Sequence, residues 1–335
     1  MLLLTRSDVK RAVTMAEAIE AAEAGLAAYS AGEAKVPVRT PVNTAGGVGL
    51  FMPGLIESRG AMGIKIVSVF AGNVSRGLPT VTALMVLNDV ETGEPLVAME
   101  AAYLTALRTG AAGGVAAKHL VRRNARTAVI FGAGAQARTQ LLGLAAVREI
   151  EKAYVFDTNA EAAERFSAEM ATQIGVMIVP GRSGSCASDA DRIAAAIAEA
   201  DVIIAATTSK TPVFDGRLVK PGTHVTGIGS YAPDMQELDE DLVMRADLFF
   251  CDTKEGAWAE AGDLLKPLSK GIIARDRVNG ELGDLVLGRR TGRTSDRQIT
   301  VYKGVGLAAL DLATAKLVYD KAIKQEMGIR VDILS

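Results

Sequence analysis

The sequence predicts an α/β protein in which a doubly wound parallel sheet is combined with a smaller α+β domain. The chain has 335 residues, enough for two domains, and its 49% hydrophobic and 23% charged residues are typical of globular proteins. Short β-rich segments fill residues 35–100. From residue 127 onward, apolar strands and amphipathic helices alternate, which indicates a parallel sheet covered by helices on both faces.

The charge pattern excludes several classes of partner. Acidic residues number 39 and basic residues 37, and the basic ones are scattered rather than clustered, so we expect no nucleic acid partner. The opening segment MLLLTRSDVK lacks a basic leader region, and no later segment approaches the ~20 apolar residues of a membrane span. We therefore expect a cytoplasmic protein without a membrane partner.

Cysteine and histidine are scarce in this chain. Cys186 and Cys251 lie far apart, without a CxxC motif or a nearby histidine, which argues against a disulfide framework and against a metal site. We expect both cysteines to be buried apolar residues. We interpret His119 and His224 as structural residues rather than catalysts.

The first domain begins with a helix. Thr14 and Glu17 form a capping box, and apolar positions recur at helical spacing until Gly32. The segments MGIKIVSVF (62–70) and TVTALMVLND (80–89) are β-rich and punctuated by Gly and Pro, which predicts a small sheet.

The charged segment RRNAR (122–126) follows a predicted helix of small residues (99–120) and marks the expected domain boundary. The last helix, within residues 304–325, follows the parallel sheet and is expected to return to the first domain. The resulting domains are residues 1–120 with 306–335, and an inserted doubly wound domain of residues 121–305.

A glycine-rich loop suggests the ligand of the second domain. Gly132, Gly134 and Ala137 directly follow the apolar strand TAVIF and open a helix. This arrangement allows a tight turn, close approach of a pyrophosphate and close helix–strand packing, with the diphosphate at the helix N-terminus. The alternative is a doubly wound domain that binds no dinucleotide.

Further cofactor-site candidates lie at the carboxyl ends of predicted strands. Asp157 ends the next strand at the distance expected for a ribose-binding acid, and its charge would repel a 2′-phosphate. We therefore favour NAD(H), with NADP(H) as the alternative. Thr207, Thr208 and Ser230 follow later strands, although either threonine could simply cap a turn.

Three basic residues of the first domain lie in unexpected surroundings. Lys65 sits in an apolar strand, Arg108 lies among small residues of a helix, and Arg39 lies in the segment VPVRTP. Singly, they could be an edge-strand charge, a snorkelling side chain and a loop charge. Together they could bind a substrate carboxylate and supply a proton donor.

Several long motifs, in order along almost the whole chain, resemble the ornithine cyclodeaminase and mu-crystallin family. These motifs include GIKIVSVF, GLPTVTALMVLNDVETGEPLVAME, LTALRTGAAGG, FGAGAQA, GTHVTGIGS and ITVYKGVGLAALD. The resemblance implies a homodimer, with an N-terminal substrate and dimerisation domain completed by the C-terminal helix. It also implies an inserted domain that binds NAD(H) or NADP(H), and a small amino or imino acid substrate.

The resemblance also assigns residues to roles. It implies that Arg39, Lys65 and Arg108 hold the substrate carboxylate and surround the reacting carbon, with Lys65 and Arg108 as the catalytic candidates. The remaining implied contacts with cofactor or substrate are Thr80, Arg108, Ala135, Gln136, Asp157 and Val305. The carbon–nitrogen bond of the substrate would then face the dinucleotide.

One departure from the family pattern decides between activities. Tyr231 stands where the resemblance implies a catalytic aspartate, Asp234 follows Pro233, and Met235 replaces an expected basic residue. A phenol is a poor base at neutral pH, whereas reduction of a preformed cyclic imine needs only hydride transfer and a protonated nitrogen.

We therefore predict a reductase of ketimines or cyclic imino acids, of the 1-pyrroline-2-carboxylate or 1-piperideine-2-carboxylate type, reversible as an amino-acid dehydrogenase. One alternative is ornithine cyclodeaminase, with Asp234 in place of the missing aspartate. The other is a dinucleotide-dependent binding protein without turnover.

Overall fold

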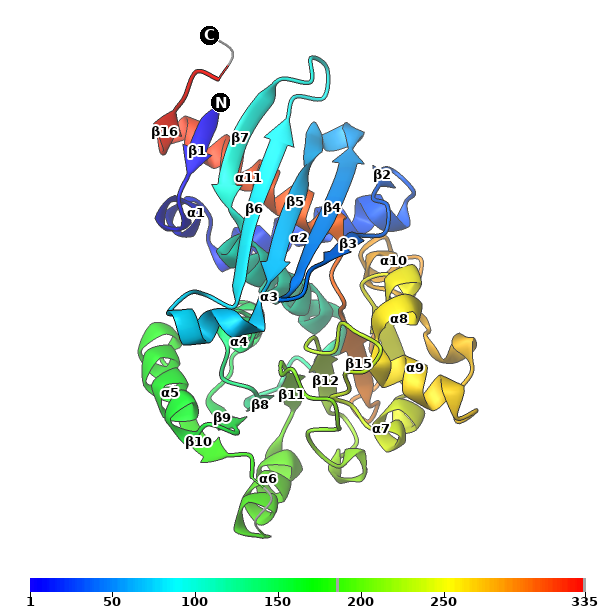
Figure 1. Ribbon diagram of the computed structural model, residues 1–335. Coiled ribbons are helices and arrows are strands. Elements are labelled where there is room, and N and C mark those ends of the chain that lie inside the picture. Colours follow the sequence, from blue (N-terminus) through cyan, green and yellow to red (C-terminus); the bar gives the residue numbers. More distant parts are fainter. Residues whose placement is uncertain (185–186, 334–335) are drawn as a thin grey trace. The chain divides into compact units, whose positions relative to one another are not determined.

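The computed structural model describes residues 1–184 and 187–333 and divides into two compact units (Figure 1). Unit 1 comprises Met1–Arg108 and Leu307–Ser335, and unit 2 comprises Thr109–Gly306. The boundary between Gly306 and Leu307 is one residue from the predicted one. The boundary between Arg108 and Thr109 falls twelve residues earlier than the predicted position after residue 120, inside a continuous helix. Cys186 lies outside the described residues.

Unit 1 is an α+β unit. Its elements are β1 (Leu2–Leu4), α1 (Arg6–Ala12), α2 (Met15–Ser30), β2 (Ala34–Lys35), β3 (Thr40–Asn43), β4 (Val48–Ile56), β5 (Ala61–Val69), β6 (Val81–Asn88), β7 (Pro95–Glu100), the first part of α3 (Ala101–Leu120), α11 (Ala308–Lys324) and β16 (Ile329–Arg330). The predicted capping box of α2 is confirmed, since Thr14 and Glu17 each bond the other's backbone N–H.

The sheet of unit 1 runs in the order β16-β1-β7-β6-β5-β4-β2, with β3 paired to β4. Strands β4 to β7 form antiparallel neighbours, so β5 is flanked on both sides. Helix α11 packs across β4, β5 and β6 and against α2, as the sequence predicts for the last helix (Figure 1). A Cβ at Gly25 of α2 would lie 2.8 Å from the Ala309 carbonyl oxygen, so glycine permits this close approach.

Unit 2 has the predicted doubly wound architecture. Its elements are β8 (Thr127–Phe131), α4 (Ala135–Ala145), β9 (Lys152–Asp157), α5 (Ala160–Ile174), β10 (Met177–Arg182), α6 (Ala187–Glu199), β11 (Val202–Ala205), β12 (His224–Gly227), α7 (Glu240–Arg245), β13 (Leu248–Cys251), α8 (Lys254–Glu260), α9 (Gly262–Ser269), β14 (Gly280–Glu281), α10 (Leu282–Val286) and β15 (Thr300–Lys303).

All strand pairs described in the sheet of unit 2 are parallel, in the order β10-β9-β8-β11-β12-β15-β13-β14. Two apolar cores lie on its opposite faces, one including Phe166 of α5 and the other Leu242 of α7. The carboxyl ends of the strands meet at one edge, where ligands of such sheets bind.

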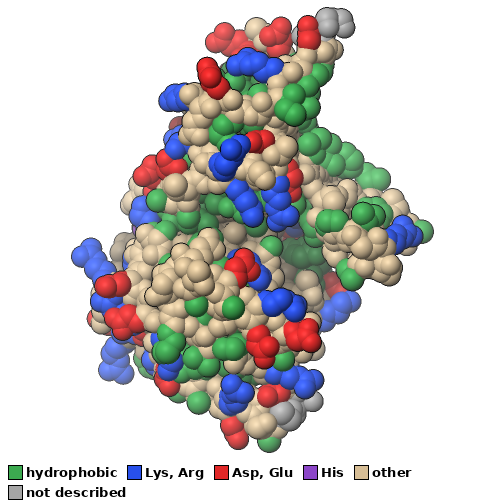
Figure 2. Space-filling model, turned by 90° about the vertical axis from the view of Figure 1, so that its left-hand side faces the viewer, with side chains coloured by type: hydrophobic (Ala, Val, Ile, Leu, Met, Phe, Trp, Pro, Cys, Tyr) green, Lys and Arg blue, Asp and Glu red, His purple; other side chains and the backbone are tan. Residues whose placement is uncertain are grey.

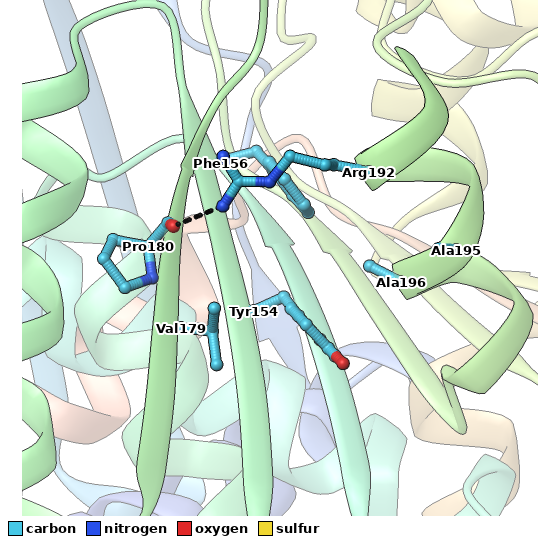
Figure 3. Close-up of a pocket in the computed structure, with 7 residues that line it drawn as sticks. All are labelled: Tyr154, Phe156, Val179, Pro180, Arg192, Ala195 and Ala196. Atoms are coloured by element: carbon cyan, nitrogen blue, oxygen red, sulfur yellow. Dashed lines mark hydrogen bonds between the residues drawn. The ribbon is translucent and has the colours of Figure 1, made fainter. Parts of the chain in front are cut away.

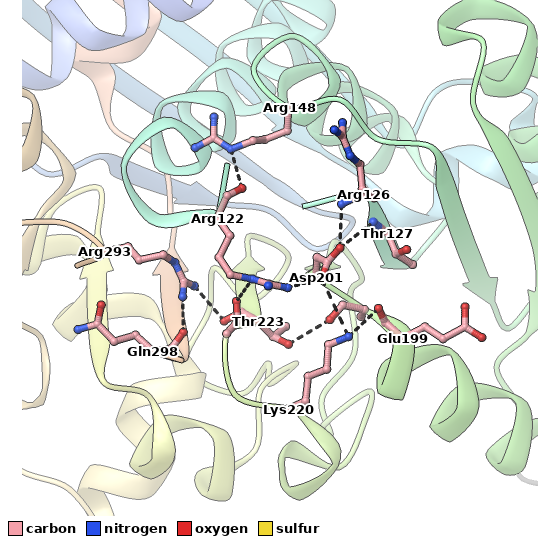
Figure 4. Close-up of polar contacts among 12 residues, drawn as sticks. Arg122, Arg126, Thr127, Arg148, Glu199, Asp201, Lys220, Thr223, Arg293 and Gln298 are labelled. Carbon is pink, nitrogen blue, oxygen red and sulfur yellow. Dashed lines mark hydrogen bonds and ion pairs between the residues drawn. The ribbon is translucent and has the colours of Figure 1, made fainter. Parts of the chain in front are cut away.

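The second half of α3 belongs to unit 2 because its small residues pack against α4. A Cβ at Gly110 would lie 2.2 Å from the Thr139 carbonyl oxygen. The carboxyl end of α3 is capped by Arg148, whose guanidinium donates to the carbonyls of Ala117 and Val121 at 2.7 and 2.8 Å. The same guanidinium donates to the Arg122 carbonyl at 3.0 Å (Figure 4). Composition alone places the domain boundary at the charged segment 122–126. The packing of Gly110 against α4 instead assigns the second half of α3 to unit 2, so the boundary falls inside the helix.

On the face shown in Figure 2, acidic and basic side chains are interspersed over much of the surface. Among the described residues, no helix has the length and apolar character needed to cross a membrane.

Candidate active site residues in the two units

Lys65 is the central residue of a buried ionic cluster in unit 1. It lies on β5 with its side chain 1% exposed, between Met52 of β4 and Met85 of β6 in the strand register. Its Nζ lies 2.7 Å from Oδ2 of Asp311 in α11. An edge-strand charge is therefore the wrong interpretation of this lysine, because β5 has a strand on each side.

Arg108 joins the same cluster from α3. Its Nε lies 2.9 Å from Oδ1 of Asp311, so one carboxylate contacts two cations through different oxygens. Arg108 is 6% exposed and Asp311 1%, which rules out a snorkelling side chain. Two of the three predicted cations thus share one buried carboxylate.

The charges of this cluster do not balance. Burial lowers the pKa of Lys65, the charges of Arg108 and Arg39 lower it further, and Asp311 raises it; the pKa lies at about 8. Arg39 lies in the partly exposed segment before β3. Excess positive charge in a desolvated place favours an incoming anion.

Asp311 was absent from the predicted site residues. It sits in GVGLAALDLATA, a run of glycine, alanine and leucine that reads as plain helix packing. The available signal was an acid within the buried face of a helix, since a buried carboxylate needs a partner. Thr80, another predicted contact, lies before β6, and its carbonyl accepts from the Phe70 N–H at 2.8 Å.

The glycine loop between β8 and α4 turns tightly and is open at Gly134. Gly132 adopts φ +95°, where other residues are strained, and a Cβ there would lie 2.5 Å from the Ala206 carbonyl oxygen. A Cβ at Gly134 would meet nothing within 4 Å. Gly134 caps α4 without a side-chain acceptor, so the N–H groups of Ala135 and Gln136 begin the helix beside open space.

Asp157 lies at the end of β9, beside this loop. Its Oδ2 accepts from the Ala133 N–H at 2.8 Å and its Oδ1 from the Asn159 N–H at 2.8 Å. The carboxylate therefore stands next to the predicted diphosphate site, where a ribose-binding acid is needed. Arg138, which is not among the predicted residues, donates to the Gly134 carbonyl at 3.2 Å and pairs with Glu169 at 2.8 Å.

Glu237 connects the ends of β11 and β12, although the sequence interpretation did not select it. One carboxylate oxygen accepts from the N–H and the hydroxyl of Thr207 at 2.5 and 2.9 Å. The other accepts from the N–H groups of Gly229 and Ser230 at 2.6 and 3.1 Å. Burial raises the pKa of Glu237. This residue braces two predicted cofactor loops.

A buried ion pair supports Glu237 in turn. Oδ1 of Asp263 accepts from the backbone N–H groups of Glu237 and Leu238 at 2.6 and 2.9 Å. Its Oδ2 lies 2.9 Å from Nζ of Lys303, and both side chains are fully buried. The Thr207 hydroxyl also accepts from the Ser209 N–H, in line with the turn-capping role considered for the threonines.

The segment leading out of unit 2 is held by Asp252. Its Oδ2 accepts from the N–H groups of Val305 and Gly306 at 3.0 and 2.7 Å. Val305 is buried, and Gly306 adopts φ +102°. The predicted substrate residue Val305 therefore has a fixed backbone.

The loop after β12 places Asp234 in solvent. Its side chain is 63% exposed and pairs with Lys210 at 2.7 Å. Tyr231 is 38% exposed. Asp234 is therefore paired with an exposed lysine on the surface of unit 2.

His224 and Cys251 have structural surroundings, as predicted. The two ring nitrogens of His224 bond the hydroxyls of Thr300 and Thr226 at 2.8 and 3.0 Å, and burial lowers its pKa to about 3. Cys251 is buried in β13, where burial raises the pKa of its thiol. Neither residue is prepared for proton transfer near neutral pH.

A separate hollow of about 180 Å³ lies between β9, β10 and α6 (Figure 3). Its lining consists of Tyr154, Phe156, Val179, Pro180, Arg192, Ala195 and Ala196. Arg192, its single charged group, donates to the Pro180 carbonyl. This hollow offers no set of groups for chemistry at a carbon–nitrogen bond.

Comparison with known proteins gives a consistent picture over the full chain. The model of the ornithine cyclodeaminase/mu-crystallin family matches residues 1–326. A Delta(1)-pyrroline-2-carboxylate reductase of Bacillus cereus (strain ZK / E33L) is 37% identical over 334 residues, covering 99% of this chain and 100% of the relative.

Two solved structures are similar throughout. Thermococcus litoralis Delta(1)-pyrroline-2-carboxylate reductase, in complex with NADH and L-proline, has a TM-score of 0.92 at 40% identity, covering 99% of this chain and 100% of that chain. An archaeal alanine dehydrogenase dimer with bound NAD has a TM-score of 0.90 at 34% identity, covering 100% and 99%.

Proposed function

Because the chain belongs to the ornithine cyclodeaminase/mu-crystallin family, we propose that it is an NAD(H)-dependent reductase of cyclic imino acids, reversible as an amino-acid dehydrogenase. The substrate class is that of 1-pyrroline-2-carboxylate. The observation that carries this proposal is the buried cluster of Lys65, Asp311 and Arg108, which has two cations for one anion.

The cluster suits a small acid with an adjacent C=N bond. Asp311 faces Nε of Arg108, which leaves the terminal nitrogens of the guanidinium to bind a carboxylate, with Arg39 as a second cation. Lys65, with its pKa of about 8, can hold or donate a proton to the imine nitrogen near neutral pH.

The cofactor fits the residues of unit 2. The open space at Gly134 suits the diphosphate and Asp157 suits the adenosine ribose, whereas its charge opposes a 2′-phosphate. When bound, the dinucleotide supplies the hydride that is added to the carbon of the C=N bond. Lys65 gives the nitrogen its proton, and the neutral amine of Lys65 is then reprotonated from water.

The position of Asp234 favours imine reduction over cyclodeamination. Deamination of ornithine needs a group that moves protons at the amine, and Asp234 was the candidate in this chain. Its carboxylate is exposed and paired with Lys210. Reduction of a preformed imine does not require this residue.

We also propose a homodimer formed through the face of the unit 1 sheet opposite α11. This face carries outward side chains such as Leu84, 45% exposed, and Figure 1 shows no described helix over it. Contiguous exposed apolar surface is typical of interfaces, and the alanine dehydrogenase is a dimer. Leu84→Arg should give a monomer in sedimentation, whereas Ile323→Arg on α11 should not.

The assay that tests the activity follows NADH oxidation with 1-pyrroline-2-carboxylate, 1-piperideine-2-carboxylate, and 2-oxo acids plus ammonia or methylamine. Ornithine plus NAD is run in parallel, with product analysis. We expect the cyclic imines to give the highest kcat/KM. Formation of proline and ammonia from ornithine, without imine reduction, would overturn the proposal.

A further inference from the structure

We infer that Asp311 is a positioning residue for this reaction, which aims the ammonium of Lys65 and keeps it protonated in its buried surroundings. The inference rests on the proposed function. It assigns Asp311 a part in catalysis exerted through Lys65 and Arg108 rather than through contact with substrate.

The geometry of the carboxylate supports this role. Oδ2 lies 2.7 Å from Nζ of Lys65, and Oδ1 lies 2.9 Å from Nε of Arg108. The two cations come from β5 and α3, and the acid comes from the first turn of α11. A long, flexible lysine side chain held at its tip by a buried acceptor loses most of its alternative positions.

The charges around Lys65 make Asp311 the group that favours its protonated form. On β5, its immediate neighbours Ile64 and Ile66 are apolar; α3 presents Arg108, and the segment before β3 presents Arg39. Burial and both guanidinium groups lower the pKa of Lys65, and Asp311 opposes all three. Without this carboxylate, the lysine would be neutral over more of the working pH range.

The two directions of the reaction need opposite forms of Lys65. Reduction of the imine needs the ammonium, which gives a proton to nitrogen while the hydride adds to carbon. Oxidation of the amino acid needs the neutral amine, which takes that proton back as hydride leaves. Loss of Asp311 should therefore move the pH profiles of reduction and of oxidation to lower pH. Loss of a carboxylate that only stabilised the fold would not move these profiles.

The test is Asp311→Asn, with kcat/KM measured against pH for reduction of 1-pyrroline-2-carboxylate by NADH and for oxidation of proline by NAD. The alkaline limb of reduction should move to lower pH by about one unit, so the rate should be about half of wild type at pH 7 and about a tenth of wild type at pH 9. The acidic limb of oxidation should move in the same direction. NADH affinity should stay within about twofold, because Asp311 is not among the proposed cofactor residues.

Asp320→Asn is the matched control. It makes the same change on the same helix, at an acid that pairs with Lys316 and is 45% exposed, and its profiles should match wild type. If an active Asp311→Asn variant kept the wild-type limbs of both pH profiles, the role of Asp311 would be overturned and the proposed function would stand. A wild-type protein that binds NADH but reduces no cyclic imine would instead overturn the proposed function.

Asp311→Glu covers the case in which the asparagine variant does not fold. It keeps the negative charge but displaces it, so kcat should fall by about tenfold while both limbs stay near their wild-type pH. A full wild-type kcat would show that the position of the carboxylate does not matter. If Asp311→Glu moved a limb of either pH profile by about one unit, this would show that the charge of the carboxylate does not set the protonation of Lys65.

Discussion

Each unit of this protein buries a lysine–aspartate pair, but the two pairs have different surroundings. Lys303 and Asp263 in unit 2 lie 2.9 Å apart, and Asp263 also accepts two backbone N–H groups next to Glu237. Lys65 and Asp311 in unit 1 lie 2.7 Å apart, with Arg108 as a further cation and no backbone donor on Asp311 among the described residues.

The difference shows how to separate a structural ion pair from a reactive one. In unit 2, Asp263 and Glu237 accept hydrogen bonds from backbone N–H groups of loop residues, so these acids hold loops in place. In unit 1, positive charge exceeds negative charge and Lys65 has a pKa of about 8. A buried group close to titration, beside unbalanced charge, marks a functional site better than burial alone.

The strongest test of this contrast replaces each lysine by methionine. Lys65→Met should lower kcat/KM for imine reduction by about 10³-fold with little change in NADH affinity, because it removes the proton donor. Lys303→Met should lower the free energy of unfolding by about 3–5 kcal/mol, because it leaves Asp263 buried without its cation. Steady-state kinetics, NADH fluorescence titration and denaturant unfolding would measure these effects. Undiminished turnover in Lys65→Met would contradict the assignment.

Arg108→Lys should have the next largest effect. The substitution keeps the charge but loses the planar fork, so KM for the imino acid should rise by about 10- to 100-fold, with a smaller change in kcat. The same change at Arg122, which pairs with Asp201 in unit 2, should leave KM unchanged and serves as a control. Equal KM values for the Arg108 variant and wild type would exclude carboxylate binding by Arg108.

Glu237→Gln should weaken NADH binding by about tenfold, because the amide presents only one acceptor oxygen to the donors of Thr207, Gly229 and Ser230. KM for the imino acid should change much less. Fluorescence titration with NADH measures the affinity. Unaltered NADH binding would show that the two braced loops do not hold the cofactor.

His224 should make the stability of the fold depend on pH. Its pKa is about 3 in the folded protein and about 6.5 when exposed, so the unfolded chain binds the extra proton between these values. The free energy of unfolding should therefore fall with falling pH below about 6.5, by up to about 1.4 kcal/mol per pH unit. His224→Gln should flatten this part of the curve in denaturant titrations, and an identical slope would contradict the expectation.

The sequence determined the features that depend on neighbouring residues. The capping box of α2, the alternation of strands and helices, and the glycine loop after β8 are all local patterns, and the structure has them where the sequence placed them. The family, too, follows from motifs that are contiguous in the chain. Lys65 and Arg108 could be selected because charge among apolar or small residues is visible in the sequence.

Only the tertiary structure decided which groups these charges meet. Asp311 lies 246 positions from Lys65 and becomes its partner because α11 returns to the sheet of unit 1. Likewise, Glu237 braces two loops that follow different strands, and α3 is divided because Gly110 packs against α4. Such pairings depend on where distant segments pack. Periodicity along the chain records which face of a segment is buried but not what lies opposite it.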